Sequence, residues 1–333
     1  MTDDESVRPV TIAYIAESAG VSVPTVSKVL NGHSGVSSDT RARVEALIHQ
    51  TGYRKPRPVL GRRMVELVFD ELEHMWGLEI IRGVERVARE HRVGVVLTEF
   101  GPQRSAIRYW IDDTVARRPS CVVTVAQLSE EQREQLRAKG IPFVVLDPVN
   151  EPPAESPFVG ATNWTGGRTA ARHLLDLGHR RIATIAGPEG FLCFQARLDA
   201  YRSAMESAGP AVVVRTAVTV DAGHAAALDL LSRPDRPTAI VTGNDLQALG
   251  VYRAARELGL RIPTDVSVVG FDDLPLATVV DPQLTTVRQP LTEMAAAATE
   301  LALALARGER APQTGLELAT RLVVRQSTAP PRR

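Results

Sequence analysis

Beyond residue 63, short apolar runs alternate with helix-length amphipathic stretches, and this alternation constrains the fold more than any other feature. The runs with the length of buried strands are residues 65–69, 93–98, 121–125, 143–146, 182–186, 239–242 and 266–270. Stretches with helical periodicity lie between many of them, at residues 78–91, 130–139, 165–177, 195–207 and 246–258. The pattern predicts parallel sheets covered on both faces, with ligands beyond the carboxyl ends of the strands. Because about 270 residues exceed one core, we predict two α/β lobes with a cleft between them.

The composition argues against several classes of protein. No apolar run approaches the roughly 18 residues that a membrane span needs. The start, Met1 to Glu5, carries three acids and no basic or apolar signal region, so we expect a cytoplasmic protein. Cys121 and Cys193 lie in apolar contexts without a CxxC motif, so we expect both in the core, without a disulfide or a zinc ion. No cofactor or metal is predicted.

The net charge of zero conceals an asymmetry along the chain. Residues 7–63 carry nine Lys/Arg and three Asp/Glu, a net charge of +6, whereas residues 64–333 carry 30 and 33, a net charge of −3. A short basic segment before a larger, slightly acidic body is typical of a nucleic-acid-binding arm, because Lys and Arg displace phosphate counterions. A solvated basic surface would have the same charge count.

The basic segment has the periodicity of three short helices. Apolar residues recur at helical spacing over residues 12–16 and 26–30, on either side of a turn at Gly20, and a third helix fits residues 38–50. Ser22 is a candidate N-cap of the second helix. Because small and hydroxylated side chains open that helix, the segment predicts a helix-turn-helix whose second helix enters the major groove.

The strings VTIAYIAESAGVSVPTVSKVLNG and GVSSDTRARVEALIHQTGYRKP closely resemble the DNA-binding headpiece of the LacI/GalR family. The resemblance implies that Val23, Pro24 and Lys28 face base edges. Lys28 is the one long donor able to reach guanine, and the other two are limited to thymine methyl groups. The other residues assigned to the DNA interface, mostly to phosphates, are Thr11, Ser22, Thr25, Ser27, Asn31, Ser37 and Thr40. Without the resemblance, Val23 would be interpreted as a core residue and Pro24 as a helix-start residue.

Residues 54–63 are basic and Pro-rich, which disfavours a regular helix and predicts a linker. In the resembled family a longer segment folds into a hinge helix on DNA and inserts a leucine into the minor groove. The stretch is shorter here, and Leu60 is the candidate wedge. The alternative is a semi-extended basic tether in which Arg57, Arg62 and Arg63 touch phosphates or the minor groove.

Enzyme motifs are missing from the expected strand ends. The sequence contains no GxGxxG after a strand and no GxxxxGKS/T, GxSxG or HExxH. His173 and His179 lie six residues apart across Gly178, and a solvated helix-end role is expected for both. The acids Asp272 and Asp273 are compatible with metal or general acid chemistry, but equally with hydrogen bonding at a strand end. We therefore predict that the protein is not an enzyme.

The body resembles the effector domain of the same family over nearly its whole length, through GGRTAARHLLDLGHRRIATIAGP, ARLDAYRSAMESAG, TAIVTGNDLQALGVYRAARELGLRIPTDVSVVGFDD and PQLTTVRQP. The resemblance implies a two-lobed fold related to periplasmic sugar-binding proteins, with a sugar or another small metabolite between the lobes. The residues that it places at this ligand are Trp76, Asp147, Arg197, Asn244, Asp272 and Gln289. Gly77 stands where many relatives carry a second aromatic residue, and Phe191 and Phe194 are candidates to fill that space.

These residue types suit a polyol. Trp76 offers a flat apolar face, carboxylates accept hydrogen bonds from hydroxyls, and Arg197 can donate two parallel hydrogen bonds. Alternatives exist for three of the polar residues. Arg197 could pair with Asp199, Asn244 could be an ordinary turn residue, and Asp272 could cap a turn.

We predict a cytoplasmic, nucleoid-associated homodimer that represses carbohydrate-utilisation genes, and whose affinity for double-stranded operator DNA changes when a sugar closes the cleft. The predicted fold is a small all-α helix-turn-helix domain followed by an α/β two-lobed, type I periplasmic-binding-protein-like domain. The predicted boundaries are residues 1–53 for the headpiece, 54–63 for the linker, and 64–333 for the effector and dimerisation domain, with lobe 1 at 64–160 and 288–316 and lobe 2 at 161–287 and 317–333. The alternatives are a sugar-binding transport component, which would need a signal peptide and no headpiece, and an enzyme.

Overall fold

The computed structural model describes residues 12–30, 35–51, 64–72, 74–101, 107–152, 155–206, 208–311 and 313–332. The chain divides into two compact units, Met1–Gly61 and Arg62–Arg333. No helix in the described ranges combines the length and the apolar character that crossing a membrane requires. The residues predicted above that lie outside these ranges are Thr11, Asn31, Arg57, Leu60, Arg62 and Arg63.

The first unit contains three helices, α1 Ile12–Ala19, α2 Val23–Leu30 and α3 Ser38–Thr51. Gly20 follows α1 with a φ of 65°, a left-handed conformation that glycine adopts without a steric penalty, and the chain turns there into α2. The buried residues that form the core come from all three helices: Ile15, Ala16, Ala19, Val26, Val29 and Val44. Val23 is 41% exposed, so its interpretation as a core residue is wrong.

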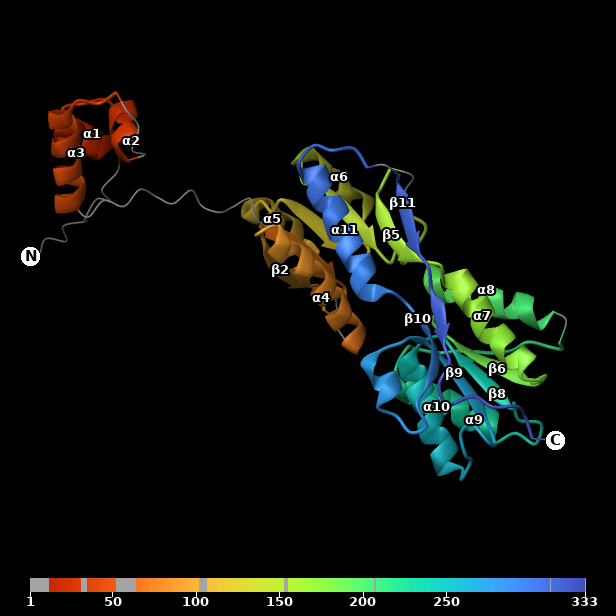
Figure 1. The fold of residues 1–333 in the computed structure, drawn as a ribbon. Coiled ribbons are helices and arrows are strands. Elements are labelled where there is room, and N and C mark those ends of the chain that lie inside the picture. Colours follow the sequence, from red (N-terminus) through yellow and green to blue (C-terminus); the bar gives the residue numbers. More distant parts are fainter. Residues whose placement is uncertain are drawn as a thin grey trace, which may run out of the picture. The chain divides into compact units, whose positions relative to one another are not determined.

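The second unit contains two six-stranded sheets (Figure 1). Lobe 1 is built on a parallel sheet with the strand order β11-β5-β4-β3-β1-β2. Its strands are β1 Met64–Phe69, β2 Gly94–Glu99, β3 Cys121–Thr124, β4 Phe143–Leu146, β5 Phe158–Ala161 and β11 Gly315–Leu318. The helices that pack on it are α4 His74–Glu90, α5 Ile107–Arg117, α6 Glu130–Ala138 and α11 Leu291–Ala306.

Lobe 2 is built on the second sheet, with the strand order β12-β10-β9-β8-β6-β7. Strand β12 runs antiparallel to β10, and the other neighbouring pairs are parallel. Its strands are β6 Ile182–Ala186, β7 Val212–Arg215, β8 Ala239–Thr242, β9 Ser267–Asp272, β10 Thr285–Arg288 and β12 Arg321–Val323. Its helices are α7 Asn163–Asp176, α8 Leu192–Met205, α9 Val220–Leu231, α10 Asp245–Glu257 and the short 3₁₀ helix η1 Pro275–Thr278.

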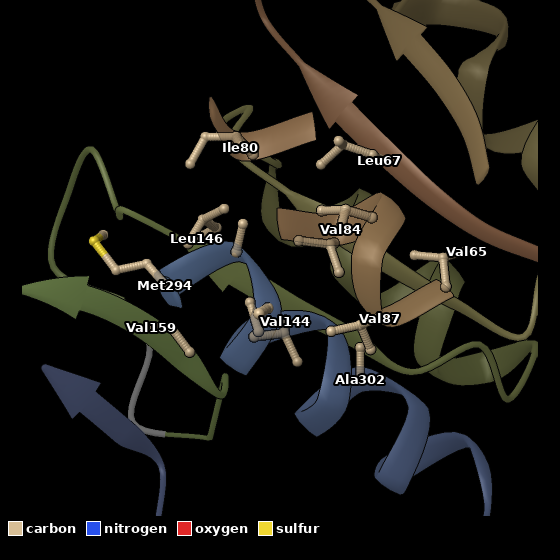
Figure 2. Packing of buried hydrophobic residues seen from close by; sticks show 14 of the residues in the cluster. Val65, Leu67, Ile80, Val84, Val87, Val144, Leu146, Val159, Met294 and Ala302 are labelled. Atoms are coloured by element: carbon tan, nitrogen blue, oxygen red, sulfur yellow. The ribbon is translucent and has the colours of Figure 1, made fainter. Parts of the chain in front are cut away.

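The largest core cluster of lobe 1 lies between its sheet and the helices α4 and α11. Figure 2 shows side chains of β1, β4 and β5 meeting those of the two helices. Helix α11 can approach α4 closely because of Gly83, where a Cβ atom would lie 2.3 Å from the carbonyl oxygen of Thr292. Apart from the buried Glu66 of β1, the strands β1, β3 and β4 are largely apolar on both faces, as expected for a parallel sheet covered by helices.

The chain crosses between the lobes three times, from β5 to α7, from β10 to α11 and from β11 to β12. Hydrogen bonds join the first crossing to the third. The backbone N–H of Thr320 donates to Thr162 Oγ1 at 2.9 Å, and Thr320 Oγ1 donates to the Thr162 carbonyl at 3.1 Å. Short crossings of this kind allow the lobes to move as bodies about a common hinge.

The expectation of solvated histidines is wrong for His179. This residue is buried, with Nδ1 2.8 Å from Thr238 Oγ1 and Nε2 2.9 Å from the carbonyl oxygen of Ala329, and burial lowers its pKa. His173 is half-buried, and its Nε2 lies 2.9 Å from Thr328 Oγ1. Both rings therefore attach the C-terminal segment of the chain to lobe 2.

Candidate functional site

The described residues of the predicted DNA interface surround the first turns of α2 and α3. The exposed ones are Ser22, Val23, Pro24, Lys28 and Ser37, and the half-buried ones are Thr25, Ser27 and Thr40. Their hydroxyls form two pairs. Ser22 Oγ lies 2.9 Å from Thr25 Oγ1, and Ser37 Oγ donates to Thr40 Oγ1 at 2.8 Å. Both pairs stand at helix N-termini, where the helix dipole favours a phosphate.

In the second unit, a cavity of about 430 Å³ opens between the lobes at the carboxyl ends of several strands. All seven residues of the predicted effector site line it: Trp76, Asp147, Phe191, Arg197, Asn244, Asp272 and Gln289. Trp76 belongs to α4 and Asp147 directly follows β4, so lobe 1 contributes two of them. The structure thus gathers residues that are far apart in the sequence, and their contact with a ligand stays a prediction.

Arg197 is the buried cation of this cavity, 7% exposed. Its Nε donates to Asn163 Oδ1 at 2.8 Å and its Nη1 donates to the Gly243 carbonyl at 2.6 Å. Nη1 also lies 3.8 Å from Asp272 Oδ1, and the guanidinium carbon lies 3.6 Å from the centre of the Phe271 ring. Arg197 therefore pairs with Asp272 across the cavity floor, and the alternative pairing with Asp199 is not formed.

Two carboxylates of the cavity occupy strained backbone positions. Asp147 has a φ of 51° and Asp272 a φ of 112°, in the left-handed region that non-glycine residues rarely adopt and that often marks functional sites. Burial raises the pKa of Asp147, an effect that Arg197 opposes. Burial likewise raises the pKa of Asp272 to about 6, although Arg197 and the hydrogen bond from Gln289 lower it. The pKa of Asp272 therefore lies closer to neutral pH than that of an exposed aspartate.

Asp245, the first residue of α10, holds the turn that follows Asp272. It was not predicted from the sequence. It is fully buried, and its Oδ2 accepts from the Leu274 backbone N–H at 2.8 Å while its Oδ1 accepts from Thr286 Oγ1 at 2.6 Å. Burial, and then the charge of Asp272, raises its pKa well above the usual value. Asp245 thus fixes the turn that holds Asp272 in its strained conformation.

Two amide side chains complete the polar lining. Asn244 Oδ1 accepts from the backbone N–H of Gln247, so Asn244 caps α10 as well as facing the cavity. Gln289 Nε2 donates to Asp272 Oδ1 at 2.6 Å. Within the described residues, Gln289 Oε1 is buried without a hydrogen-bond partner, which is costly unless another group donates to it.

Aromatic residues line the cavity from both lobes. Trp76 lies on lobe 1, and on lobe 2 the rings of Phe191 and Phe194 have centres 6.1 Å apart. Phe194 fits against Gly187, where a Cβ atom would lie 2.3 Å from the ring. Both phenylalanines line the cavity, as does Phe69 at the end of β1, whereas a Cβ atom at Gly77 would lie 3.0 Å from Leu72 Cδ1.

Sequence reasoning missed other lining residues. Asp70 and Glu71 follow β1 and could have been found, because ligands bind beyond the carboxyl ends of parallel strands.

Cys121 is a core residue as expected, but Cys193 lines the cavity, so its assignment to the core is wrong. Burial raises the pKa of the Cys193 thiol to about 12. Among the described residues, no group of His, Cys, Asp and Glu is arranged to hold a metal ion.

A helical unit with hydroxyl pairs at two helix N-termini, in one chain with a two-lobed domain that has a polar cavity, is typical of ligand-responsive DNA-binding regulators. Comparisons with known proteins agree. The family described as bacterial regulatory proteins, lacI family, matches residues 11–55, and the family described as periplasmic binding protein-like domain matches residues 171–328. The HTH-type transcriptional regulator MalR of Streptomyces coelicolor is 36% identical over 96% of this chain and 96% of its own length.

Two solved structures extend the likeness to the fold. The transcriptional regulator CelR in its complex with cellobiose has a TM-score of 0.72 and 33% identity, covering 96% of this chain and 100% of that one. The lac repressor dimer bound to operator and the anti-inducer ONPF has a TM-score of 0.76 and 27% identity, covering 97% and 100%. The chain belongs to the LacI family of transcriptional regulators. Proteins of this family are not enzymes.

Proposed function

We propose that the protein is a homodimeric repressor whose affinity for operator DNA is controlled by a neutral sugar bound between the lobes. The observation that carries this proposal is the interlobe cavity, in which Gln289 Oε1 is buried without a partner in the described residues, close to Arg197 and Asp272. A sugar hydroxyl would supply the missing donor. Repression of carbohydrate-utilisation genes in the cytoplasm, with residues 1–53 as headpiece, 54–63 as linker and 64–333 as effector domain, is part of the same proposal.

The charges of the cavity favour a neutral ligand. Among the residues that the structure describes, four acidic side chains and one cation line it. That cation, Arg197, already uses Nε and Nη1 within the protein and lies against Asp272. A phosphate or carboxylate group on the ligand would therefore meet mostly like charge, whereas hydroxyls can both donate to carboxylates and accept from amides. Trp76 and the phenylalanine pair offer flat apolar surfaces to the C–H faces of a sugar ring.

A panel of neutral sugars and their phosphorylated counterparts, tested by thermal unfolding of the full chain, should separate these ligand classes. A neutral effector at 100 times its Kd should stabilise the protein by about 2.7 kcal/mol, whereas the phosphorylated form should give no increase. Trp76→Ala should reduce the shift, since it removes a lining face of the cavity. Equal stabilisation by the phosphorylated sugars would contradict the assignment of a neutral ligand.

We further propose that Lys28 reads a base, while Thr25 and Ser37 hold the DNA backbone. Lys28 is exposed three residues after Thr25, on the same face of α2. Lys28→Ala should weaken binding to the preferred site by about 1–3 kcal/mol and relax the preference at one base position. Arg43→Ala, which removes an equal charge from α3, is the control and should not change the preference. An equal loss on preferred and random DNA would reassign Lys28 to a phosphate.

A further inference from the structure

A second cavity, of about 850 Å³, lies at the edge of lobe 1 opposite to the effector cavity. We call it the basal cavity. Val93, Ser120 and Ile141, which directly precede or lie just before β2, β3 and β4, line it. Because the strands of this sheet are parallel, the basal cavity stands at their amino ends, where the helices of lobe 1 terminate.

Four basic side chains line the basal cavity, and over the described ranges no carboxylate does: His91, Arg118, Lys139 and Arg307. Two of them have acidic partners nearby. His91 lies 2.9 Å from Glu300, and Arg307 lies 2.6 Å from Glu309. In the part of the chain that the structure describes, the other two, Arg118 and Lys139, form no ion pair. They provide unneutralised positive charge on a body whose net charge is −3.

The backbone at Arg118 has a conformation that carries a steric cost. The residues that turn the chain after α6 and α11 are Gly140 and Gly308, with φ values of 65° and 82°, as helix C-termini prefer. After α4 and α5 the same left-handed conformation falls on arginines, Arg92 with a φ of 54° and Arg118 with a φ of 51°. Of these two, Arg118 lines the basal cavity. Arginine adopts this conformation only at a steric cost that glycine avoids. The preceding residue, Arg117, already pairs with Glu66 at 2.7 Å, so the end of α5 does not need a second cation.

The basal cavity also lies where the linker joins the effector domain. The backbone N–H of Ser120, on the cavity wall, donates to the carbonyl of Met64, the first residue of β1, at 2.8 Å. Twelve residues separate Thr51, the end of α3, from Met64. Such a segment spans at most about 40 Å when fully extended, which sets an upper limit on the distance between the end of α3 and Met64.

We propose that Arg118 and Lys139 contact the phosphate backbone of DNA, so that the effector domain adds sequence-independent affinity to that of the headpiece. This inference rests on the proposed function, because it requires the full chain to bind DNA. It assigns to lobe 1 a direct contact with DNA in addition to its contact with the effector. Movement of lobe 1 would then change the DNA affinity through these phosphates as well as through the headpieces.

The test is the salt dependence of DNA binding by the full chain, measured on an operator selected from a random pool and on random duplex DNA. Because the proposed repressor is a homodimer, Arg118→Gln/Lys139→Gln removes four phosphate contacts. It should reduce the slope of log affinity against log salt by about 3.6, equally on both DNAs. The matched control is Arg172→Gln/Arg256→Gln, which removes two exposed charges from lobe 2 and should leave the slope unchanged.

The possible results separate the two proposals. Wild-type protein that binds neither DNA would overturn the proposed function and this inference with it. Normal wild-type binding with an unchanged slope in the double variant would overturn this inference alone. Arg118→Gly controls for misfolding, since glycine relieves the left-handed strain. It removes one contact from each subunit and should still reduce the slope by about 1.8. An unchanged slope together with thermal stabilisation by inorganic phosphate would instead assign the basal cavity to a small anion.

Discussion

Arg197→Ala should abolish the response of operator binding to the effector and lower the free energy of unfolding by about 3–5 kcal/mol. The stability loss has a local cause. Arg197 lies 3.8 Å from the buried carboxylate of Asp272 and donates to the carbonyl of Gly243. Alanine therefore removes the cation beside Asp272, which keeps the hydrogen bond from Gln289, and removes a donor to the Gly243 carbonyl. Denaturant unfolding of wild type and variant measures this effect.

The same substitution should weaken effector binding by about 1.5–3 kcal/mol, since it removes a charged hydrogen-bond donor from the cavity. Calorimetry with the identified sugar provides the measurement. DNA binding without effector should persist, because residues 1–61 form a separate compact unit. Asp199→Ala is the control, since Asp199 is exposed on the same helix and forms no pair with Arg197. Unchanged effector affinity in a folded Arg197→Ala protein would remove Arg197 from the site.

The free energy of unfolding should fall by about 3 kcal/mol, through Asp272 alone, as the pH rises from about 4 to above 6. The pKa of Asp272 is raised from 3.8 to about 6 in the folded protein, mainly by burial. Between these values the folded protein binds a proton that the unfolded chain has released. Protonation therefore stabilises the fold, and this stabilisation is complete below pH 3.8 and lost as the pH passes 6.

Urea unfolding of wild type and Asp272→Asn across this pH range measures the contribution of Asp272. The difference in free energy of unfolding between the two proteins should change by about 3 kcal/mol. Asp281→Asn, which neutralises an exposed acid of the same lobe, should follow the wild-type profile. Parallel profiles for wild type and Asp272→Asn would show that the Asp272 carboxyl titrates normally in the folded protein.

The helix-turn-helix and the alternating α/β body could be predicted from periodicity, because their apolar residues face cores made largely by neighbouring elements. Periodicity did not predict strands such as β7 (VVVR) and β10 (TTVR). They have only four residues each, and their burial depends on strands distant in the sequence. Helix α9, VDAGHAAALDLL, also escaped, since alanine and glycine give a weak apolar stripe and pack instead through their small size.

In the candidate site, too, some residues could be predicted from the sequence and others could not. Family resemblance was enough to select six residues that line one cavity, although they are far apart in the sequence. It could not find Asn163, whose Oδ1 accepts from Arg197, or Asp245, which fixes the Asp272 turn. Both act through another side chain, and such a role depends on three-dimensional neighbours. The burial of His179 was likewise unpredictable, because its partner Ala329 lies 150 residues away.

The return of α11 to lobe 1 has a consequence for biosynthesis. Met294, Ala298 and Ala302 belong to the same core cluster as Val65 and Val84, yet they leave the ribosome more than 200 residues later. At a synthesis rate of about 5–20 residues per second, the apolar faces of β1 and α4 stay exposed for on the order of ten seconds before α11 can pack on them. The headpiece, whose contacts are local, can fold at once. We therefore expect nascent chains that end before residue 291 to hold a folded headpiece on an aggregation-prone, chaperone-dependent lobe 1.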